Sequence, residues 1–132
     1  EHFPAFSQKR FKGLMEFFEL PHNKSIKNLS QGQKNQFEVI MAMCQGADYI
    51  LMDEPFAGID PIAVADIKHM IRLLAKRGIG ILITDHNVRD TLEITDRALI
   101  VSSGQITISG TKDEILNSEL AREIYLGKDF AM

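Results

Sequence analysis

Residues 49–61 read YILMDEPFAGIDP: an apolar run leads into two adjacent carboxylates, a proline and a turn that contains Gly58. A short run that is apolar throughout is typical of a parallel strand covered on both faces. Because burial of an unpaired charge is costly, Asp53 and Glu54 are expected at the strand end, where a positive group meets them. The stretch therefore predicts a buried strand over 49–52 with polar chemistry at its end.

Two helices are predicted before this strand. Ser7 is a candidate N-cap for a helix over 6–20, and Ser30 starts a second helix that runs to about Cys44, where Gly46 gives a stop signal. Each helix carries apolar residues at helical spacing, namely Phe11, Leu14, Met15 and Phe18 in the first and Phe37, Ile40, Met41 and Cys44 in the second.

The residues after the strand alternate between helix and strand. We expect a helix after Pro61 that buries Ile67, Met70, Ile71 and Leu74, and a second buried strand over 79–84. A short helix over 88–95, capped by Asn87 or Asp85, a hairpin over 97–110, a helix over 112–117 capped by Thr111 and a last helix over 119–125 follow. The fold class is α/β, with parallel strands joined by helical crossovers and a subdomain boundary near 46–48.

Composition excludes several classes of protein. The 132 residues are 45% hydrophobic and 25% charged, which is typical of a folded domain. The net charge of −3 gives no basic surface for nucleic acid, and no apolar run approaches the roughly 18 residues that cross a bilayer. The first residues lack the apolar core of a signal peptide. The single cysteine, Cys44, is expected to be a buried apolar side chain.

The segment NLSQGQK, residues 28–34, places a serine and a glycine before a helix. The free backbone N–H groups and the dipole of such a helix end attract anions, and Gly32 permits a close backbone approach. The alternative is an ordinary N-cap, because Gln33 follows Ser30 by three residues, as in a capping box.

Polar side chains also follow both predicted strands. With one carboxylate on each face of the strand end, Asp53 and Glu54 could hold Mg²⁺ and polarise an attacking water, as hydrolysis of a nucleoside triphosphate requires. His86 follows the second strand and could donate to a phosphate oxygen. The alternatives are an acidic surface turn and a loop histidine. Ligands bind at the carboxyl ends of neighbouring parallel strands, so these residues together indicate a ligand site more strongly than each does alone.

These motifs resemble those of ATP-binding-cassette (ABC) ATPases. LSQGQ, residues 29–33, is similar to the LSGGQ signature, with Gln31 in place of a glycine. YILMDEP is similar to the Walker B strand with its catalytic glutamate, AGID to the D-loop, and His86 to the switch histidine. The resemblance implies a partial P-loop NTPase fold, with residues 1–46 in the helical subdomain and 47–132 in the C-terminal part of the RecA-like core.

The resemblance also implies roles for individual residues. Asp53 would be associated with Mg²⁺, Glu54 would be the general base, and His86 would contact the γ-phosphate of ATP. Asp60 would contact the opposite subunit of a dimer. The signature residues Ser30, Gln31, Gly32 and Gln33 would clasp ATP held mainly by that subunit, and Gln31 is expected to be tolerated if it points away from the phosphate.

Within the family, DEPFAGIDPIAVADIK, GILITDHNVRDTLEITDRALIVSSG and IYLGKDF most closely resemble the ATPases of lipopolysaccharide export. Residues 1–45 look more like exporters of the drug or polysaccharide type, which leaves a hybrid or engineered chain open. The expected partners are a second ATPase subunit and a transmembrane permease, at the cytoplasmic face of the cell membrane.

The sequence contains no G-x-x-x-x-G-K-[ST] phosphate loop. The resemblance covers about the latter half of a family ATPase domain, so the isolated chain is expected to bind Mg-ATP weakly or not at all. Two alternatives to a transport ATPase are a non-catalytic ABC-derived binding or dimerisation module and a soluble ABC protein not involved in transport.

Overall fold

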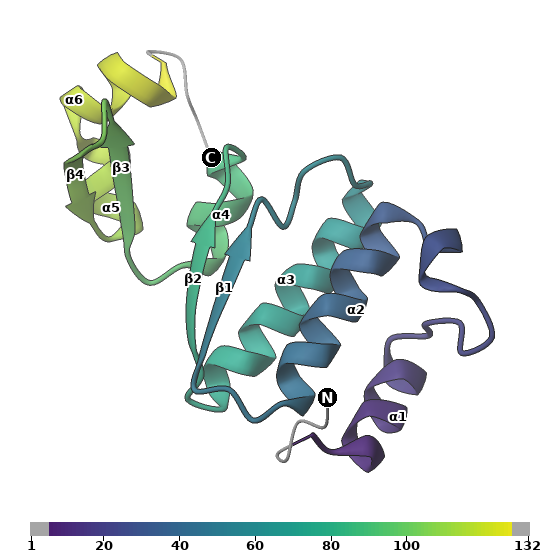
Figure 1. Cartoon of the computed structure of the whole chain (residues 1–132). Coiled ribbons are helices and arrows are strands. Elements are labelled where there is room, and N and C mark those ends of the chain that lie inside the picture. The colour runs from purple at the N-terminus through teal and green to yellow at the C-terminus, as the bar shows by residue number, and fades with distance from the viewer. Residues whose placement is uncertain (1–5, 128–132) are drawn as a thin grey trace. The chain divides into compact units, whose positions relative to one another are not determined.

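The computed structural model describes residues 6–127, which fall into two compact units divided between Asp85 and His86. The first unit contains α1 (Gln8–Phe17), a 3-10 turn (Ile26–Asn28), α2 (Gln31–Cys44), β1 (Tyr49–Asp53), α3 (Pro61–Lys76) and β2 (Gly80–Thr84) (Figure 1). The second contains α4 (Val88–Ile94), β3 (Ala98–Ser102), β4 (Gln105–Gly110), α5 (Lys112–Asn117), α6 (Glu119–Ala121) and a π-helical turn (Arg122–Leu126). None of the described helices has the length and apolarity needed to cross a membrane.

The two sheets of the described chain have two strands each. β1 and β2 are parallel and in register from Tyr49 opposite Gly80 to Asp53 opposite Thr84, with α3 as the crossover, which confirms the predicted α/β arrangement. β3 and β4 form the predicted antiparallel hairpin. Its turn is made by Ser103 and Gly104, both at positive φ, which suits the right-handed twist of a hairpin.

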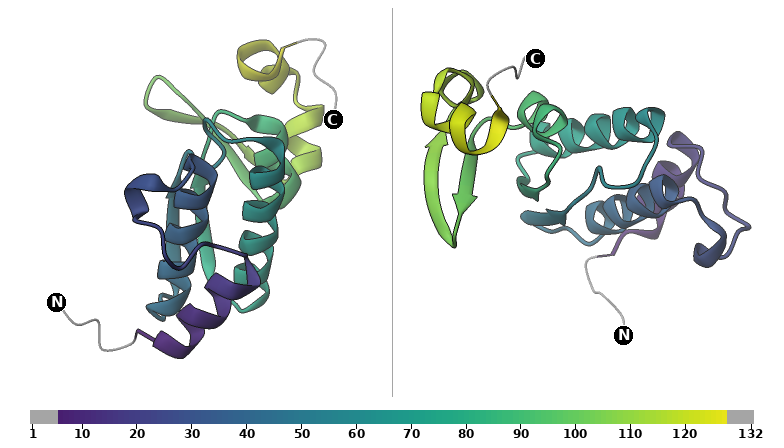
Figure 2. Two further views of the ribbon diagram at one scale, coloured as in Figure 1. Left: turned by 90° about the vertical axis from the view of Figure 1, so that its right-hand side faces the viewer. Right: turned by 90° about the horizontal axis from the view of Figure 1, so that it is seen from above.

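The core of the first unit lies among the helices and one face of the strands. α2 packs against both α1 and α3 (Figure 2). The predicted stripe of α3 is buried throughout, and Ile67, Met70 and Leu74 are fully inaccessible to solvent. Full burial of such side chains stabilises the fold by roughly 1.5–3 kcal/mol each. Of the predicted stripe of α2, Ile40 and Cys44 are buried, whereas Phe37 and Met41 are half-buried. Because α2 lies between two helices, Val39 and Met43 outside that stripe are buried as well.

Helix ends follow the predicted caps, although α1 is shorter than predicted. The Ser7 hydroxyl accepts a hydrogen bond from the Arg10 backbone N–H at 3.3 Å, so the helix starts after Ser7. It ends at Phe17 rather than Leu20, because Glu19 has a left-handed backbone with φ of 52°. α2 ends as predicted before Gly46, whose φ is 71°.

Cys44 is completely buried, as predicted, at the end of α2. Burial raises the pKa of its thiol, and the charge of Arg10 opposes this effect. A thiol with a raised pKa is a poor nucleophile, so Cys44 serves as a small apolar side chain.

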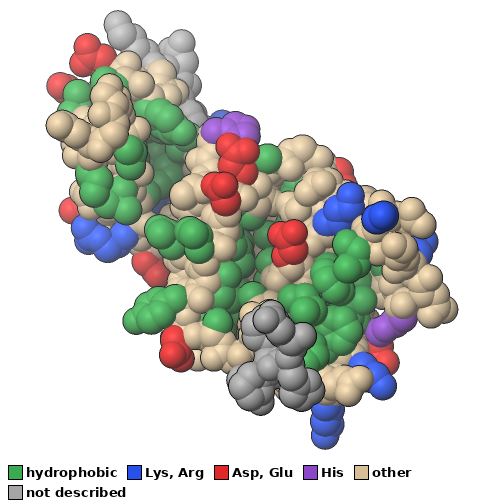
Figure 3. Space-filling model, viewed as in Figure 1, with side chains coloured by type: hydrophobic (Ala, Val, Ile, Leu, Met, Phe, Trp, Pro, Cys, Tyr) green, Lys and Arg blue, Asp and Glu red, His purple; other side chains and the backbone are tan. Residues whose placement is uncertain are grey.

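The prediction that both strands are covered on both faces is wrong for the described chain. Ile50 and Met52 of β1 are buried, but Leu51 is 68% exposed and Leu82 of β2 is 57% exposed. Figure 3 shows apolar side chains at the surface over these strands. The helices of the first unit pack on one face only, so the apolar residues of the other face remain accessible.

The second unit has a small core of its own. Its buried residues are Leu92, Ile100, Ile115 and Ala121. Asn87 caps α4 by accepting from the Asp90 backbone N–H, which decides between the two predicted caps. Thr111 caps α5 as predicted, and Glu114 completes a capping box. The backbone N–H of Thr111 donates to the Glu114 carboxylate at 2.7 Å and lowers the pKa of that carboxyl.

Alanine substitutions at two neighbouring residues of β1 test which face of the strand is buried. We expect Ile50→Ala to lower the free energy of unfolding by about 2–4 kcal/mol, because it leaves a cavity against the helices. The matched change Leu51→Ala should cost less than about 1 kcal/mol, because this side chain is exposed. Urea unfolding followed by circular dichroism measures both. Equal losses would show that the outer face is covered in solution.

Candidate functional site

The carboxylates of Asp53 and Glu54 lie at the carboxyl end of β1. Asp53 is paired with Thr84 at the end of β2, and the Thr84 hydroxyl donates a hydrogen bond to the Asp53 carboxylate. The Glu54 backbone N–H donates to the Thr84 carbonyl oxygen at 2.7 Å, which continues the parallel ladder one residue beyond the strand. Both residues are exposed, so their carboxylates are accessible to a ligand.

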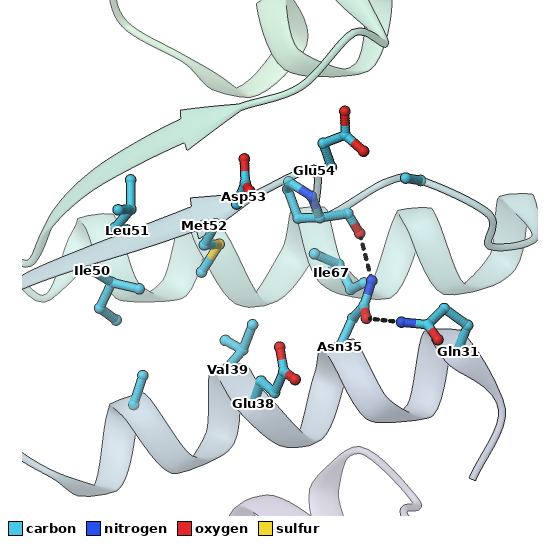
Figure 4. A pocket seen from close by; sticks show the side chains of 13 residues that line it. Gln31, Asn35, Glu38, Val39, Ile50, Leu51, Met52, Asp53, Glu54 and Ile67 are labelled. Atoms are coloured by element: carbon cyan, nitrogen blue, oxygen red, sulfur yellow. Dashed lines mark hydrogen bonds between the residues drawn. The ribbon is translucent and has the colours of Figure 1, made fainter.

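The two carboxylates do not lie on opposite faces, as strict alternation along a strand would predict. Glu54 has φ of 48°, in the left-handed region that residues other than glycine rarely adopt. This conformation ends the alternation, and Figure 4 shows both carboxylates on the side of β1 that faces away from α2. The turn therefore gathers the two acidic groups on one side of the strand end.

Three hydrogen bonds hold the residues that follow Glu54. The Asn35 side-chain amide of α2 donates to the Pro55 carbonyl oxygen at 2.9 Å, and the Phe56 backbone N–H donates to the Asp85 carboxylate at 2.9 Å. The Ala57 backbone N–H donates to the Glu54 carbonyl oxygen at 3.1 Å. Because Pro55 and Phe56 are also buried, the turn is fixed by its surroundings.

A groove with a volume of about 510 Å³ lies between α2 and the end of β1 (Figure 4). Apolar side chains, including Val39 and Met52, line its base. Its polar lining includes Asn35, Glu38 and Glu54. The groove thus connects the first turns of α2 with the acidic strand end.

The signature-like segment forms the start of α2, with Ser30 as its N-cap. The Ser30 hydroxyl accepts from the Gln33 backbone N–H at 3.2 Å, and the Gln33 side chain accepts from the Ser30 backbone N–H at 3.1 Å. The capping box suggested by the sequence is therefore confirmed. Within the described chain, no hydrogen-bond partner is found for the backbone N–H groups of Gln31 and Gly32. The helix itself does not use these two donors, which lie at the positive end of its dipole.

Gly32 has a packing role that the sequence did not reveal. It is buried, and a Cβ placed on it would lie 2.6 Å from the Cβ of Ala63 in α3. Atoms of this kind do not approach so closely, so any side chain here would push α2 and α3 apart. The glycine is thus required for the close approach of two helices, independently of any ligand.

The remaining predicted residues fall at element ends. Asp60 is the N-cap of α3, and its carboxylate accepts from the backbone N–H groups of Ile62 and Ala63 at 3.0 Å each. His86 is exposed and is the first residue of the second unit, where its carbonyl oxygen accepts from the Val88 backbone N–H at 3.0 Å. The first unit therefore brings Asp53 and Glu54 together, and the proximity of His86 to them stays a prediction.

Comparisons with known proteins show what the chain is similar to. No family model matches the chain. The lipopolysaccharide export system ATP-binding protein LptB of Escherichia coli K12 is 45% identical over 127 residues, which cover 95% of this chain and 53% of that protein. A nucleotide-free ATP-binding cassette from an ABC transporter superposes with a TM-score of 0.78 at 30% identity, over 91% of this chain and 50% of that one. The chain is similar to the C-terminal half of ABC transporter ATPases.

Other ABC ATPases match over a similar extent. A probable ABC transporter ATP-binding protein of Azorhizobium caulinodans is 45% identical over 90% of this chain and 43% of its own length. The chain thus spans about half the length of the curated relatives it matches. The alignment with LptB covers 95% of the chain and so includes most of residues 1–45. The similarity to LptB therefore extends to the segment whose motifs look more like those of drug or polysaccharide exporters.

Sequence reasoning missed two polar residues of the site. Asn35 contacts the turn after Glu54, and its spacing of four residues from Gln31 could have indicated a side-chain pair on one helix face. The sequence pattern places Thr84 only in a strand, and its position opposite Asp53 follows from the parallel pairing. Asn35 and Thr84 have these roles only because the fold brings them next to residues that are distant in the sequence.

The close approach at Gly32 can be tested by substitution. We expect Gly32→Ala to lower the free energy of unfolding by about 1–3 kcal/mol, because its Cβ overlaps that of Ala63. Urea unfolding of Gly32→Ala, Ala63→Gly and the double variant measures the coupling. The double variant should recover most of the loss caused by Gly32→Ala. Additive losses would contradict the proposed clash.

Proposed function

We propose that this chain is part of the ATPase subunit of an ABC transporter, in which hydrolysis of Mg-ATP drives export across or from a membrane. The observation that carries the proposal is the exposed pair Asp53 and Glu54 on a fixed turn at the end of a parallel strand. This is the place where open α/β sheets bind ligands. The homology with ABC ATPases supplies the reaction.

In this proposal Glu54 is the general base. Its carboxylate accepts a proton from the attacking water while the water oxygen bonds to the γ-phosphorus and the bond to the leaving oxygen of ADP breaks. The fixed turn would hold the Glu54 carboxylate within hydrogen-bond reach of the attacking water, as a general base requires. His86 contacts the γ-phosphate, which its imidazole can reach as a hydrogen-bond donor.

Asp53 is proposed to associate with Mg²⁺, and its surroundings fit this ion. The carboxylate oxygens are hard ligands of the type that Mg²⁺ prefers, and the Thr84 hydroxyl orients one of them. The described residues contain no cluster of three or more histidine, cysteine or acidic side chains that could hold a metal. Mg²⁺ typically takes one or two carboxylates and fills its other positions with water and substrate phosphates. When bound, it would neutralise charge on the phosphates.

The signature segment is proposed to bind the γ-phosphate of ATP on a second subunit. Ser30 and Gln33 cap the helix, and the backbone N–H groups of Gln31 and Gly32 offer the donors. Asp60 is proposed to contact the same subunit from the start of α3. The similarity to the ADP conformation of the cassette MJ1267, with a TM-score of 0.77 at 30% identity, supports nucleotide as the ligand.

The assignment of parts and partners follows the family. We propose that residues 1–46 belong to the helical subdomain and 47–132 to the RecA-like core. A second ATPase subunit and a transmembrane permease are the proposed partners, at the cytoplasmic face of the membrane. The homologue LptB is named for lipopolysaccharide export, and cbiO1 of Clostridium perfringens, 25% identical, is part of the transporter complex cbiONQ.

The chain is proposed to need the other half of the cassette for activity. The exposed apolar face that contains Leu51 and Leu82 offers a surface for that half. The phosphate loop, whose backbone N–H groups cradle phosphates, is absent from these 132 residues. The same absence favours the second candidate function, a non-catalytic binding or dimerisation module.

Calorimetric titration of the 132-residue chain with Mg-ATP tests this dependence. We expect no detectable binding, because the chain lacks the phosphate loop that makes most contacts to the β- and γ-phosphates. Addition of a polypeptide that corresponds to the N-terminal half of LptB should restore binding. Micromolar binding by the chain alone would contradict the proposed division of roles.

Glu54→Gln tests the general base in such an assembly. The amide keeps the shape of the side chain but cannot accept the proton, so kcat should fall by about 10²–10⁴-fold while nucleotide binding is kept. Glu38→Gln is the matched control, because Glu38 also lines the groove but has no proposed role, and its kcat should change less than about twofold. A near wild-type rate for Glu54→Gln would refute the assignment.

A further inference from the structure

The position at which this chain departs from the LSGGQ signature carries an interaction of its own. Gln31 is the first residue of α2, and its side-chain amide donates to the Asn35 side-chain oxygen at 2.9 Å. The Asn35 amide nitrogen then donates to the Pro55 carbonyl oxygen at 2.9 Å. Figure 4 shows these two hydrogen bonds in sequence, from the start of α2 to the turn after β1. A glycine at position 31 could not make the first of them.

We propose that Gln31 and Asn35 are positioning residues for Glu54, acting through the Pro55 carbonyl. The proposal rests on the proposed function, because it assigns to Glu54 the role of general base. Gln31 does not touch the turn by hydrogen bond itself. It acts by fixing which end of the Asn35 side-chain amide faces Pro55.

The orientation of the Asn35 amide is the critical step. An asparagine side chain has one accepting oxygen and one donating nitrogen. The carbonyl of Pro55 can only accept, so Asn35 must present its nitrogen there. Donation from Gln31 to the Asn35 oxygen stabilises this orientation and disfavours the flipped one. The start of α2 and the turn are thereby linked through the Asn35 side-chain amide, which has two distinct orientations.

The turn has a reason to need such support. Residues other than glycine in left-handed backbone conformations cost on the order of 1–3 kcal/mol and persist only when the surroundings fix them. Glu54 is such a residue, with φ of 48°. The Glu54 backbone N–H donates to Thr84 of β2, and the Phe56 backbone N–H donates to Asp85, the residue after β2. Asn35 supplies the hydrogen bond from α2, so it connects the signature segment to the position of the base.

Gln31→Glu tests the link without weakening the helix. A glutamate at this first position is favourable for the helix dipole, so the helix should stay folded. Its carboxylate cannot donate, and it accepts from the Asn35 nitrogen instead, which turns that nitrogen away from Pro55. Gln8→Glu is the matched control, because Gln8 is the first residue of α1 and likewise follows a serine cap.

Nuclear magnetic resonance of the 132-residue chain provides the first measurement. Gln31→Glu should shift the backbone amide signals of Glu54, Phe56 and Ala57, and Gln8→Glu should leave them unchanged. In the Asn35→Leu background, Gln31→Glu should no longer shift these signals, because its effect passes through Asn35. Unchanged signals in the single variant, or equal shifts in both backgrounds, would overturn the proposal.

Steady-state hydrolysis in the assembly used for Glu54→Gln separates positioning from a purely structural contact. We expect Gln31→Glu and Asn35→Leu each to lower kcat by about three- to tenfold, and Gln31→Glu in the Asn35→Leu background to cause no further loss. Unchanged kcat alongside shifted signals would also overturn the proposal. If the assembly of wild-type chains hydrolyses no ATP, the proposed function fails, and the resonance experiment still decides whether the link exists.

Discussion

The parallel pairing of β1 with β2 is the constraint on which the rest of the first unit depends. It places Asp53 opposite Thr84 and extends to the Glu54 backbone N–H, which donates to the Thr84 carbonyl oxygen. Because parallel strands need a crossover, the chain must cross by α3, and the start of α3 is therefore held near the acidic turn. The same crossover brings Ala63 against Gly32 and so holds the start of α2 close to α3.

The strained backbone of Glu54 is held in place by hydrogen bonds to the residues around it. Glu54 is left-handed, yet hydrogen bonds to Pro55, Phe56 and Ala57 hold the residues that follow it. The donors and acceptors come from α2, from the residue after β2 and from the turn itself. A strained residue that is fixed from several directions is a recurrent feature of functional sites. Here the strain has a visible result, since it turns two adjacent carboxylates to the same side of the strand.

Much of the fold could be predicted from local signals. The caps Ser7, Ser30 and Thr111 define helix starts because a side-chain oxygen and a free N–H lie within three residues of each other. The site residues Asp53 and Glu54 could be predicted because an apolar run ends at them. Features that depend on tertiary pairing could not be predicted. The packing role of Gly32 needs Ala63, which lies 31 positions further along the chain, and the link from Asn35 to Pro55 needs the helix to lie beside the turn.

The prediction that β1 and β2 are covered on both faces is wrong, and the exposed face tells something about how the chain packs. An apolar residue at every position of a strand indicates cover on both faces, and Ile50 has such cover whereas Leu51 does not. Large exposed apolar surfaces mark places where other protein binds. The chain is similar to about half of each curated relative, and its outer strand face is apolar. The helices of the first unit therefore account for the apolar residues on one face of the strands, and the exposed face with Leu51 and Leu82 is a surface on which other protein could bind.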